Sequence, residues 1–418
     1  MVDRNNTDDI KTKKLQKRLD IILTFFFLAV ICFMGVMTVA TDFDGLHKAF
    51  GQRKKVKAFL EDQENYTQWD FLEARVKSLD NYLSGNVYMS DELGVLNSTL
   101  QYAMGKRMIT TGGASMLTLN TGHLYDLQDY VSMDEAAHNI EQMKQNCADT
   151  PFLFLYEHPT IYDYEQQMPA GYEALDYSRE IADEIVEKTR ALGIDTIDSR
   201  EVLTASNTPL EEYLMYTDQH WSTKAALILA RELLPELSEM TGTTLNETLL
   251  ADDQLNTQTF EKLFLGKYGQ RAGVNNIAPD DITIYWPKYE TNIHRYTYYL
   301  GDEYDLTGSF YDSVIRWKYL EPDEGKSWNI KAYFDYGLTE NYDLFENPDG
   351  ADLTVLLLKD SYSAPIASFL SLAVKNVVSV DLRRSEQPLE TWVEEYKPDA
   401  VIVAYSMQML RDDDYEFQ

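Results

Sequence analysis

Residues 353–363 read LTVLLLKDSYS, an apolar run that gives way at once to polar residues. The segment from Leu353 to Leu358 is typical of a strand buried on both faces of a sheet. A helical pattern follows from Ser363 to Val374, so Ser361 lies in the turn between a predicted strand and a predicted helix. In doubly wound sheets, ligands bind at the carboxyl ends of strands. We therefore expect a functional site at this turn.

Similar short apolar segments alternate with helical patterns along the chain. The predicted strands cover residues 152–156, 194–197, 377–380 and 400–404, and the predicted helices 134–147, 175–192, 222–240 and 389–396. Continuously apolar strands that alternate with helices indicate a parallel sheet covered on both faces. The sequence thus predicts an α/β fold with a doubly wound, mostly parallel sheet.

Tyrosine and tryptophan are unusually frequent between residues 256 and 347. Aromatic residues favour strands, so this stretch is predicted to form a β-rich insertion in the α/β domain. Two interpretations stay open. The aromatic side chains either form a surface that stacks on sugar rings or simply pack between strands, and the second is the more common arrangement.

The N-terminal region predicts a membrane anchor. Residues 21–40 contain no charged side chain and are long enough to cross a bilayer as a helix. Five basic residues cluster between Lys11 and Arg18, in the segment of residues 1–20 that precedes this run, which predicts a cytoplasmic tail and an extracytoplasmic position for the rest of the chain. We expect a single-pass protein of the cell membrane, anchored by an uncleaved helix. Residues 41–87 are predicted to be a helical juxtamembrane stalk and residues 88–418 a catalytic domain.

Composition narrows the classes of function. The net charge of −32 disfavours a nucleic-acid partner. The two cysteines are Cys32, inside the predicted span, and Cys147, so no disulfide is expected within the exported part. A large exported domain without disulfides is typical of bacteria. Neither an HExxH motif nor paired CxxC motifs occur, and no glycine fingerprint for a nucleotide follows a strand, so neither a metal nor another cofactor is expected.

The best candidate for a general base is His220, one of six histidines, in the segment Tyr216-Thr217-Asp218-Gln219-His220-Trp221-Ser222. Asp218 and His220 are two residues apart, so in an extended segment both side chains point the same way and can pair. A paired carboxylate orients an imidazole as a base for a serine nucleophile. With Ser361, these residues supply the three roles of nucleophilic acyl transfer. The alternative is a carboxylate and serines that only cap helices, beside a structural histidine.

At these residues the sequence resembles the bacterial DHHW family, which is related to the alginate O-acetyltransferase branch of the SGNH hydrolases. The resemblance rests on Asp218-Gln219-His220-Trp221 and on Lys359-Asp360-Ser361-Tyr362, with a loop at residues 265–271 between them and a terminal segment at residues 380–383. Gln219 replaces the first histidine of the family's name motif. Lys359 stands where other SGNH hydrolases have glycine. The similarity covers most of the chain after about residue 88.

The resemblance implies an SGNH hydrolase-like fold and a Ser361-His220-Asp218 site that acts on cell-envelope or exported polysaccharide. It further implies that backbone donors near Ser361, including Tyr362, and the central loop bind the oxyanion, with Gly266 and Arg271 as candidates. The expected activity is O-acetyl transfer, with acetyl groups supplied by a membrane-bound acyl-transfer protein. Two alternatives remain open: an esterase that removes acetyl groups with the same triad, and a non-catalytic glycan-binding scaffold of an export complex.

Overall fold

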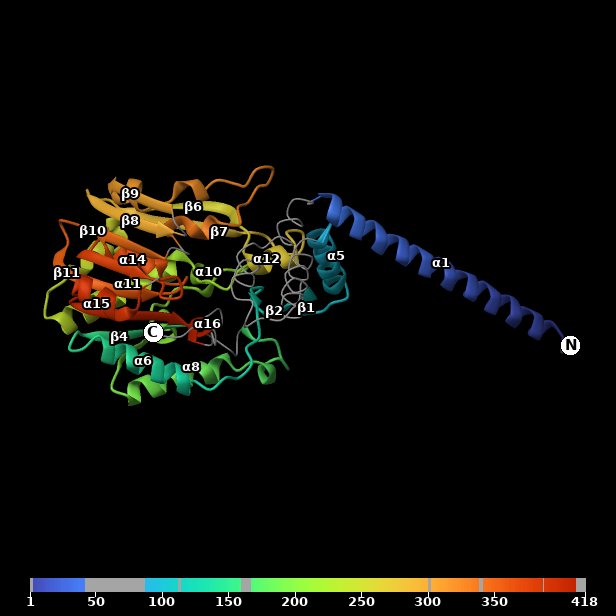
Figure 1. Ribbon diagram of the computed structural model, residues 1–418, viewed down its shortest axis with the longest axis horizontal. Coiled ribbons are helices and arrows are strands. Elements are labelled where there is room, and N and C mark those ends of the chain that lie inside the picture. The colour runs from blue at the N-terminus through green and yellow to red at the C-terminus, as the bar shows by residue number, and fades with distance from the viewer. Residues whose placement is uncertain are drawn as a thin grey trace, which may run out of the picture. The chain divides into compact units, whose positions relative to one another are not determined.

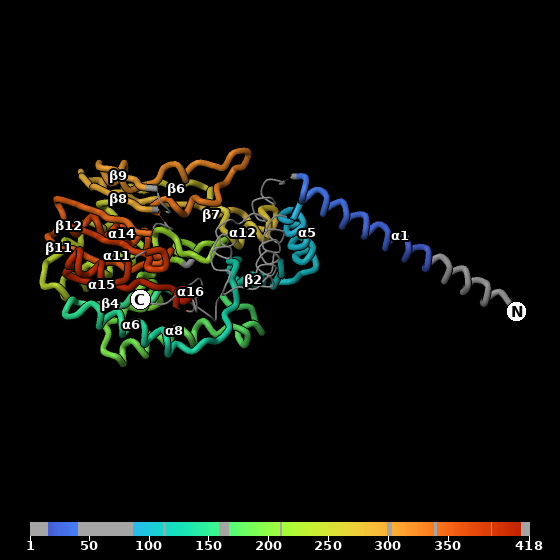
Figure 2. The backbone as a smooth tube through the Cα atoms, in the orientation of Figure 1, coloured from blue at the N-terminus to red at the C-terminus, as the bar shows by residue number. Residues whose placement is uncertain are grey.

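The computed structural model describes residues 3–41, 87–111, 114–158, 167–299, 302–337, 341–385 and 387–410. The chain divides into two compact units, residues 1–96 and 97–418 (Figures 1 and 2). The predicted stalk at residues 41–87 lies almost entirely outside the described residues. The domain limits inferred from the sequence therefore stay a prediction.

The first unit contains α1 (Asp3–Thr41). Within α1, Gln16–Ala40 is the one described segment that is long and apolar enough to cross a membrane. The amide of Tyr88 donates a hydrogen bond of 3.0 Å to Thr38 Oγ1 near the end of this helix. Helix α5 (Ser90–Ala103) follows. Its leucines recur at Leu93, Leu96 and Leu100, a helical spacing that outweighs the single glycine inside the segment.

The second unit is built on an eight-stranded mixed sheet, in the order β5-β4-β13-β11-β12-β10-β8-β9. The first five strands are parallel, and the last three continue the sheet in antiparallel pairing. Their bounds, in sheet order, are Asp195–Asp198, Phe152–Glu157, Ala400–Ser406, Ala351–Lys359, Val374–Val380, Tyr342–Glu346, Ile293–Tyr299 and Asp302–Gly308. The prediction of a doubly wound, mostly parallel α/β sheet is confirmed.

The aromatic insertion contributes strands in two ways. β6 (Leu255–Phe264) and β7 (Asp280–Pro287) pair with each other as a separate two-stranded sheet. Strands β8, β9 and β10 instead extend the main sheet beyond β12. The insertion is β-rich, as predicted, and three of its strands complete the central sheet. A small sheet of β1 (Met108–Thr111), β2 (Ala114–Thr118) and β3 (Leu124–Tyr125) precedes the domain core.

Helices cover both faces of the main sheet, and α6 and α8 lie side by side on one of them (Figure 1). The helices are α6 Asp134–Asn146, α8 Ser178–Ala191, α9 Ser199–Ala205, α10 Leu210–Tyr213, α11 Thr223–Thr241, α12 Lys267–Ala272, α13 Phe310–Ser313, α14 Ala364–Leu370, α15 Leu389–Tyr396 and α16 Met407–Leu410. The 3-10 turns are η1 Glu173–Leu175, η2 Glu247–Leu250, η3 Asp252–Gln254, η4 Trp317–Tyr319 and η5 Ala332–Tyr336. Helix α14 is shorter than predicted, because Val374 already belongs to β12.

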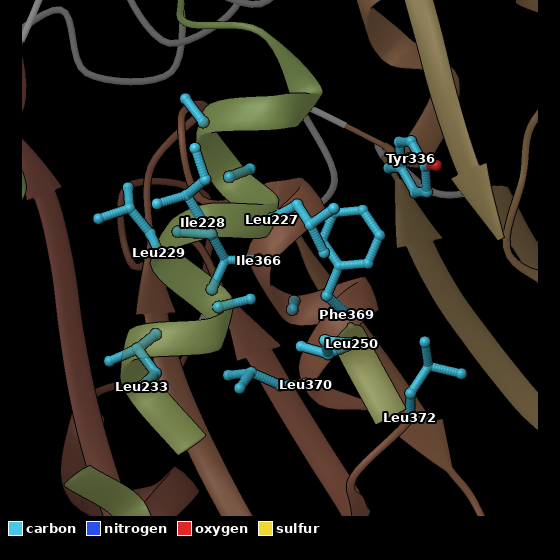
Figure 3. Packing of buried hydrophobic residues seen from close by; sticks show 14 of the residues in the cluster. Leu227, Ile228, Leu229, Leu233, Leu250, Tyr336, Ile366, Phe369, Leu370 and Leu372 are labelled. Carbon is cyan, nitrogen blue, oxygen red and sulfur yellow. The ribbon is translucent and has the colours of Figure 1, made fainter. Parts of the chain in front are cut away.

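Alternate residues of β11 pack into different cores. Val355 and Leu357 join a cluster with α11 and α14, whereas Leu356 and Leu358 join a cluster with α6, α8 and α15. Figure 3 shows the first cluster, with the leucines of α11 beside the apolar side chains of α14. Burial of one leucine side chain stabilises the folded state by about 1.5–3 kcal/mol. The strand that leads to Ser361 is thus fixed by apolar packing on both of its faces.

Candidate active site

Ser361 lies in the turn between β11 and α14, and its side chain is half-buried. The preceding residue, Asp360, shapes this turn. Its carboxylate accepts one hydrogen bond of 2.8 Å from the amide of Tyr362 and another of 2.8 Å from the amide of Ser406, at the end of β13. Asp360 thereby joins the serine turn to the neighbouring strand.

The structure brings the three residues singled out in the sequence into one chain of hydrogen bonds. His220 Nε2 lies 2.8 Å from Ser361 Oγ, and His220 Nδ1 lies 2.5 Å from Asp218 Oδ1. Two further bonds join the segments that carry them. Trp221 Nε1 donates to the carbonyl of Tyr362 at 3.0 Å, and the Tyr362 hydroxyl donates to the carbonyl of Gln219 at 2.9 Å.

The carboxylate of Asp218 is buried but well supplied with donors. Its Oδ2 accepts a hydrogen bond of 2.8 Å from the amide of Lys267, and its Oδ1 accepts from the amide of His220 at 3.2 Å. Burial opposes ionisation, but the charge of His220 and these hydrogen bonds outweigh it and lower the pKa of Asp218. Asp218 is therefore a carboxylate at neutral pH, as the partner of an imidazole that accepts a proton must be.

The loop at residues 265–271 packs directly against the Asp218 segment. The amide of Gly266 donates to Thr217 Oγ1 at 2.8 Å, and the amide of Gly269 donates to the carbonyl of Thr217 at 2.8 Å. A Cβ atom on Gly266 would lie 2.3 Å from Asp218 Cβ, and one on Gly269 would lie 2.6 Å from Thr217 Cβ. Only glycine fits at these two positions, so this loop holds Asp218 in place.

Asp280 is a further support that the sequence analysis did not identify. It begins β7, and its carboxylate accepts hydrogen bonds from the amide of Tyr216 at 2.6 Å and from the amide and hydroxyl of Thr217 at 2.9 and 2.5 Å. Burial raises the pKa of Asp280 to about 7 despite these donors. A single aspartate so far along the chain carries no sequence signal that would connect it with Asp218.

Two tyrosine rings enclose His220. The ring centroid of Tyr333, in η5, lies 4.6 Å from the centroid of the His220 imidazole, and the two ring planes are 27° apart. The ring centroid of Tyr362 lies 4.7 Å from the same imidazole, and those two planes are 45° apart. The Tyr333 hydroxyl is buried and has no hydrogen-bond partner in the described part of the chain. Tyr333 was one of many tyrosines in the aromatic stretch, and nothing in the sequence set it apart. The two rings restrict how far the imidazole can tilt.

The candidates for binding an oxyanion have other partners in this structure. The amide of Tyr362 donates to Asp360, and the amide of Gly266 donates to Thr217. The carbonyl of Arg271 accepts from the Ser98 hydroxyl, and no hydrogen bond joins Arg271 to Ser361 or His220. The amide of Ser361 itself donates no hydrogen bond within the described residues.

A second buried carboxyl group lies beneath the serine turn. Glu157 ends β4, and its register partner is Ser406, whose amide is bonded to Asp360. Burial and the nearby charge of Asp360 raise the pKa of Glu157 well above its usual range. The described residues contain no group of three or more histidine, cysteine, aspartate or glutamate side chains that could hold a metal ion.

Part of the chain matches a known family model, and the chain aligns with several solved structures. Residues 158–293 match a family model described as "SGNH hydrolase-like domain, acetyltransferase AlgX". Among solved structures, a DHHW family protein from Eubacterium siraeum aligns with a TM-score of 0.55 and 18% identity, over 74% of this chain and 95% of that one. PatB1 from Bacillus cereus, in a structure with a sulfonyl adduct, aligns with a TM-score of 0.58 and 16% identity, over 72% of this chain and 98% of the other.

The search of curated proteins gave no match. At these levels of identity, the solved structures establish the fold, and the match to the family model adds the link to acetyltransferases. The resemblance seen in the short sequence motifs is confirmed.

Proposed function

Since the chain carries an SGNH hydrolase-like domain related to acetyltransferase sequences, we propose that it transfers acetyl groups to a polysaccharide through an acyl-serine intermediate. The observation that carries this proposal is the continuous hydrogen-bond chain from Asp218 through His220 to Ser361. It lies at the carboxyl end of β11, in the position where doubly wound sheets bind ligands. A protein that only binds glycans has no need of this arrangement.

In the proposed reaction, Ser361 Oγ attacks the carbonyl carbon of an acetyl ester while His220 Nε2 takes the hydroxyl proton. The C–O bond to the leaving alcohol then breaks, and His220 returns the proton to that alcohol. A sugar hydroxyl next gives its proton to His220 and attacks the acetyl-serine, which restores Ser361. Asp218 remains ionised throughout and stabilises the charged imidazole.

The tetrahedral intermediate places a negative charge on the former carbonyl oxygen. We propose that the amide of Ser361 stabilises it, because this donor has no other partner in the described chain. Removal of one donor aimed at such an oxygen costs about 2.7–4 kcal/mol where this has been measured, in that case for an asparagine side chain. Further donors at Gly266 or Tyr362 would require the bonds to Thr217 or Asp360 to open first.

The setting of the reaction follows from the apolar helix. We propose that residues 21–40 anchor the chain in the cell membrane, with the domain outside the cytoplasm. Acetyl-CoA is absent there, so a membrane-bound acyl-transfer protein would supply the acetyl group. The same acyl-serine could instead be resolved by water, which would make the protein an esterase. The triad serves both reactions, and the acceptor decides between them.

The test uses the full chain in detergent with p-nitrophenyl acetate as acyl donor. Release of p-nitrophenol should be lost in Ser361→Ala and His220→Ala and retained in Ser132→Ala, whose exposed serine donates a hydrogen bond to Asp134. Phenylmethylsulfonyl fluoride should label Ser361, as judged by mass spectrometry, and His220→Ala should slow the labelling. Activity that survives Ser361→Ala in a folded protein would refute the acyl-serine mechanism and favour the glycan-binding scaffold.

A further inference from the structure

A cavity of about 190 Å³ opens beside the antiparallel extension of the sheet, away from the three residues of the proposed triad. It lies among β8, β10, α15 and the loop that follows β12. Its lining combines aromatic rings with amide and charged groups: Tyr298, Asn341, Tyr342, Arg384, Ser385, Gln387, Trp392, Glu395 and Tyr396. Pockets for drug-sized molecules measure about 300–1,000 Å³, so this one has room for a single ring.

Four aromatic rings form a continuous series along the cavity. Tyr298 stacks on Tyr342 at 5.5 Å, Tyr342 meets Trp392 edge-on at 5.1 Å, and Trp392 stacks on Tyr396 at 5.8 Å. Trp392 is buried and supports the series, whereas Tyr298, Tyr342 and Tyr396 are only half-buried. Partly exposed aromatic rings can stack on the apolar faces of a sugar ring. Rings that are already held by packing against their neighbours lose little conformational entropy when a ligand binds.

The polar groups indicate a ligand without net charge. Arg384 and Glu395 bring one charge of each sign, and Asp381 lies 3.6 Å from Arg384 Nε. The net charge of −32 on the chain also disfavours a polyanionic ligand. Gln387 is exposed, and its side-chain amide can both donate to and accept from sugar hydroxyl groups.

The cavity lies on the same edge of the sheet as Ser361. Val380 of β12 pairs with Leu358 of β11 on one side and with Tyr342 on the other. Neighbouring strands are about 4.8 Å apart, so Tyr342 lies roughly 10 Å across the sheet from the strand that leads to Ser361. A polymer of a few sugar rings can span this separation.

From these observations we propose that the cavity is an acceptor subsite, which binds one uncharged sugar ring of the polymer while another ring of the same chain presents its hydroxyl to Ser361. Only the role of this cavity as an acceptor subsite rests on the proposed acetyl transfer. Its capacity to bind sugar is a separate property.

The experiment uses the full chain in detergent and two uncharged probes, cellopentaose and penta-N-acetylchitopentaose, beside the anionic trigalacturonate. Binding is followed by the fluorescence of tryptophan, since Trp392 lies in the cavity. Loss of one ring face in Tyr396→Ala or Tyr298→Ala should weaken binding by about three- to tenfold. Tyr396→Phe keeps the ring and should bind normally, and Tyr304→Ala removes an exposed tyrosine outside the cavity.

Acetyl transfer supplies a second readout. Tyr396→Ala should raise the KM for the oligosaccharide and leave the hydrolysis of p-nitrophenyl acetate unchanged, because that small donor does not reach the cavity. The proposal is overturned if neither uncharged probe binds, if trigalacturonate binds more tightly, or if Tyr304→Ala weakens binding as much as Tyr396→Ala. If sugar binds as expected but Ser361→Ala does not affect acyl transfer, the enzyme assignment fails and the sugar site stands.

Discussion

The two segments that form the site are held by different forces. The segment Thr217–His220 is fixed by hydrogen bonds that it accepts from the loop at residues 265–271 and by hydrogen bonds that Thr217 donates to Asp280. The turn at Ser361 follows a strand packed on both faces, and the side chains of α14 are buried along its whole length. The acid–base segment thus depends on a polar network from remote parts of the chain, and the nucleophile depends on the core. Mutations in the two regions should therefore have different signatures.

Among variants outside the proposed triad, the largest effect is expected from Gly266→Ala. The added Cβ would lie 2.3 Å from Asp218 Cβ and must displace the carboxylate that orients His220. A misplacement of about 1 Å costs about 100-fold in rate, so kcat/KM for p-nitrophenyl acetate should fall by about that factor. Gly308→Ala is the matched control, because its Cβ would lie at an ordinary 3.5 Å from Asp312. Equal activity of the two variants would show that the loop does not position Asp218.

A smaller effect is expected at the ring that stacks on His220. Tyr333→Leu removes the aromatic face and lets the imidazole tilt, which should lower kcat about tenfold with little change in KM. Tyr333→Phe keeps the ring and deletes a hydroxyl that has no partner in the described chain, so its activity should match that of the wild type. Steady-state kinetics of the two variants decide the matter. A loss in Tyr333→Phe as large as in Tyr333→Leu would assign the effect to the hydroxyl.

The smallest effect concerns the pH dependence of stability. The pKa of Asp280 is about 7 in the folded chain, against about 3.9 for an aspartate in an unfolded one. Between these values the folded state keeps a proton that the unfolded state loses, so this group lowers the free energy of unfolding as pH rises from about 4 to about 7. Asp280→Asn should flatten this slope by at most about 1.4 kcal/mol per pH unit.

Thermal unfolding at several pH values, compared with that of Asp281→Asn, measures the effect. Asp281 is the exposed neighbour of Asp280. A slope that is equally steep in Asp280→Asn and in the wild type would place the titration elsewhere, and the polar network would then not be sensitive to pH.

The same contrast explains how far the sequence predicts the fold. Strands β4, β11, β12 and β13 each contain a short run of apolar residues, and all four were predicted. The membership of β8, β9 and β10 in the main sheet could not be predicted. Their aromatic residues favour strands, but partners such as Tyr342 and Val380 are distant in sequence, and local composition does not encode such pairing.

For the site, sequence reasoning reaches the residues whose chemistry is rare. His220 is one of only six histidines, and Ser361 directly follows a strongly apolar predicted strand, so both could be singled out. Asp218 was then identified because it lies two residues before His220. The supports of the site are ordinary residue types. A backbone amide at Lys267, a carboxylate at Asp280 and a ring at Tyr333 acquire their roles only through contacts across the fold.

The position of β13 has a consequence for the order in which the protein can mature. This strand, Ala400–Ser406, lies between β4 and β11. The amide of Ser406 donates a hydrogen bond to the carboxylate of Asp360, in the turn that carries Ser361. While a chain is still being synthesised, every residue of the proposed triad emerges before the strand that joins the two halves of the sheet. The nascent chain therefore holds no assembled nucleophile until β13 has been made, and a premature stop before Ala400 should yield an inactive product even though Asp218, His220 and Ser361 are all present.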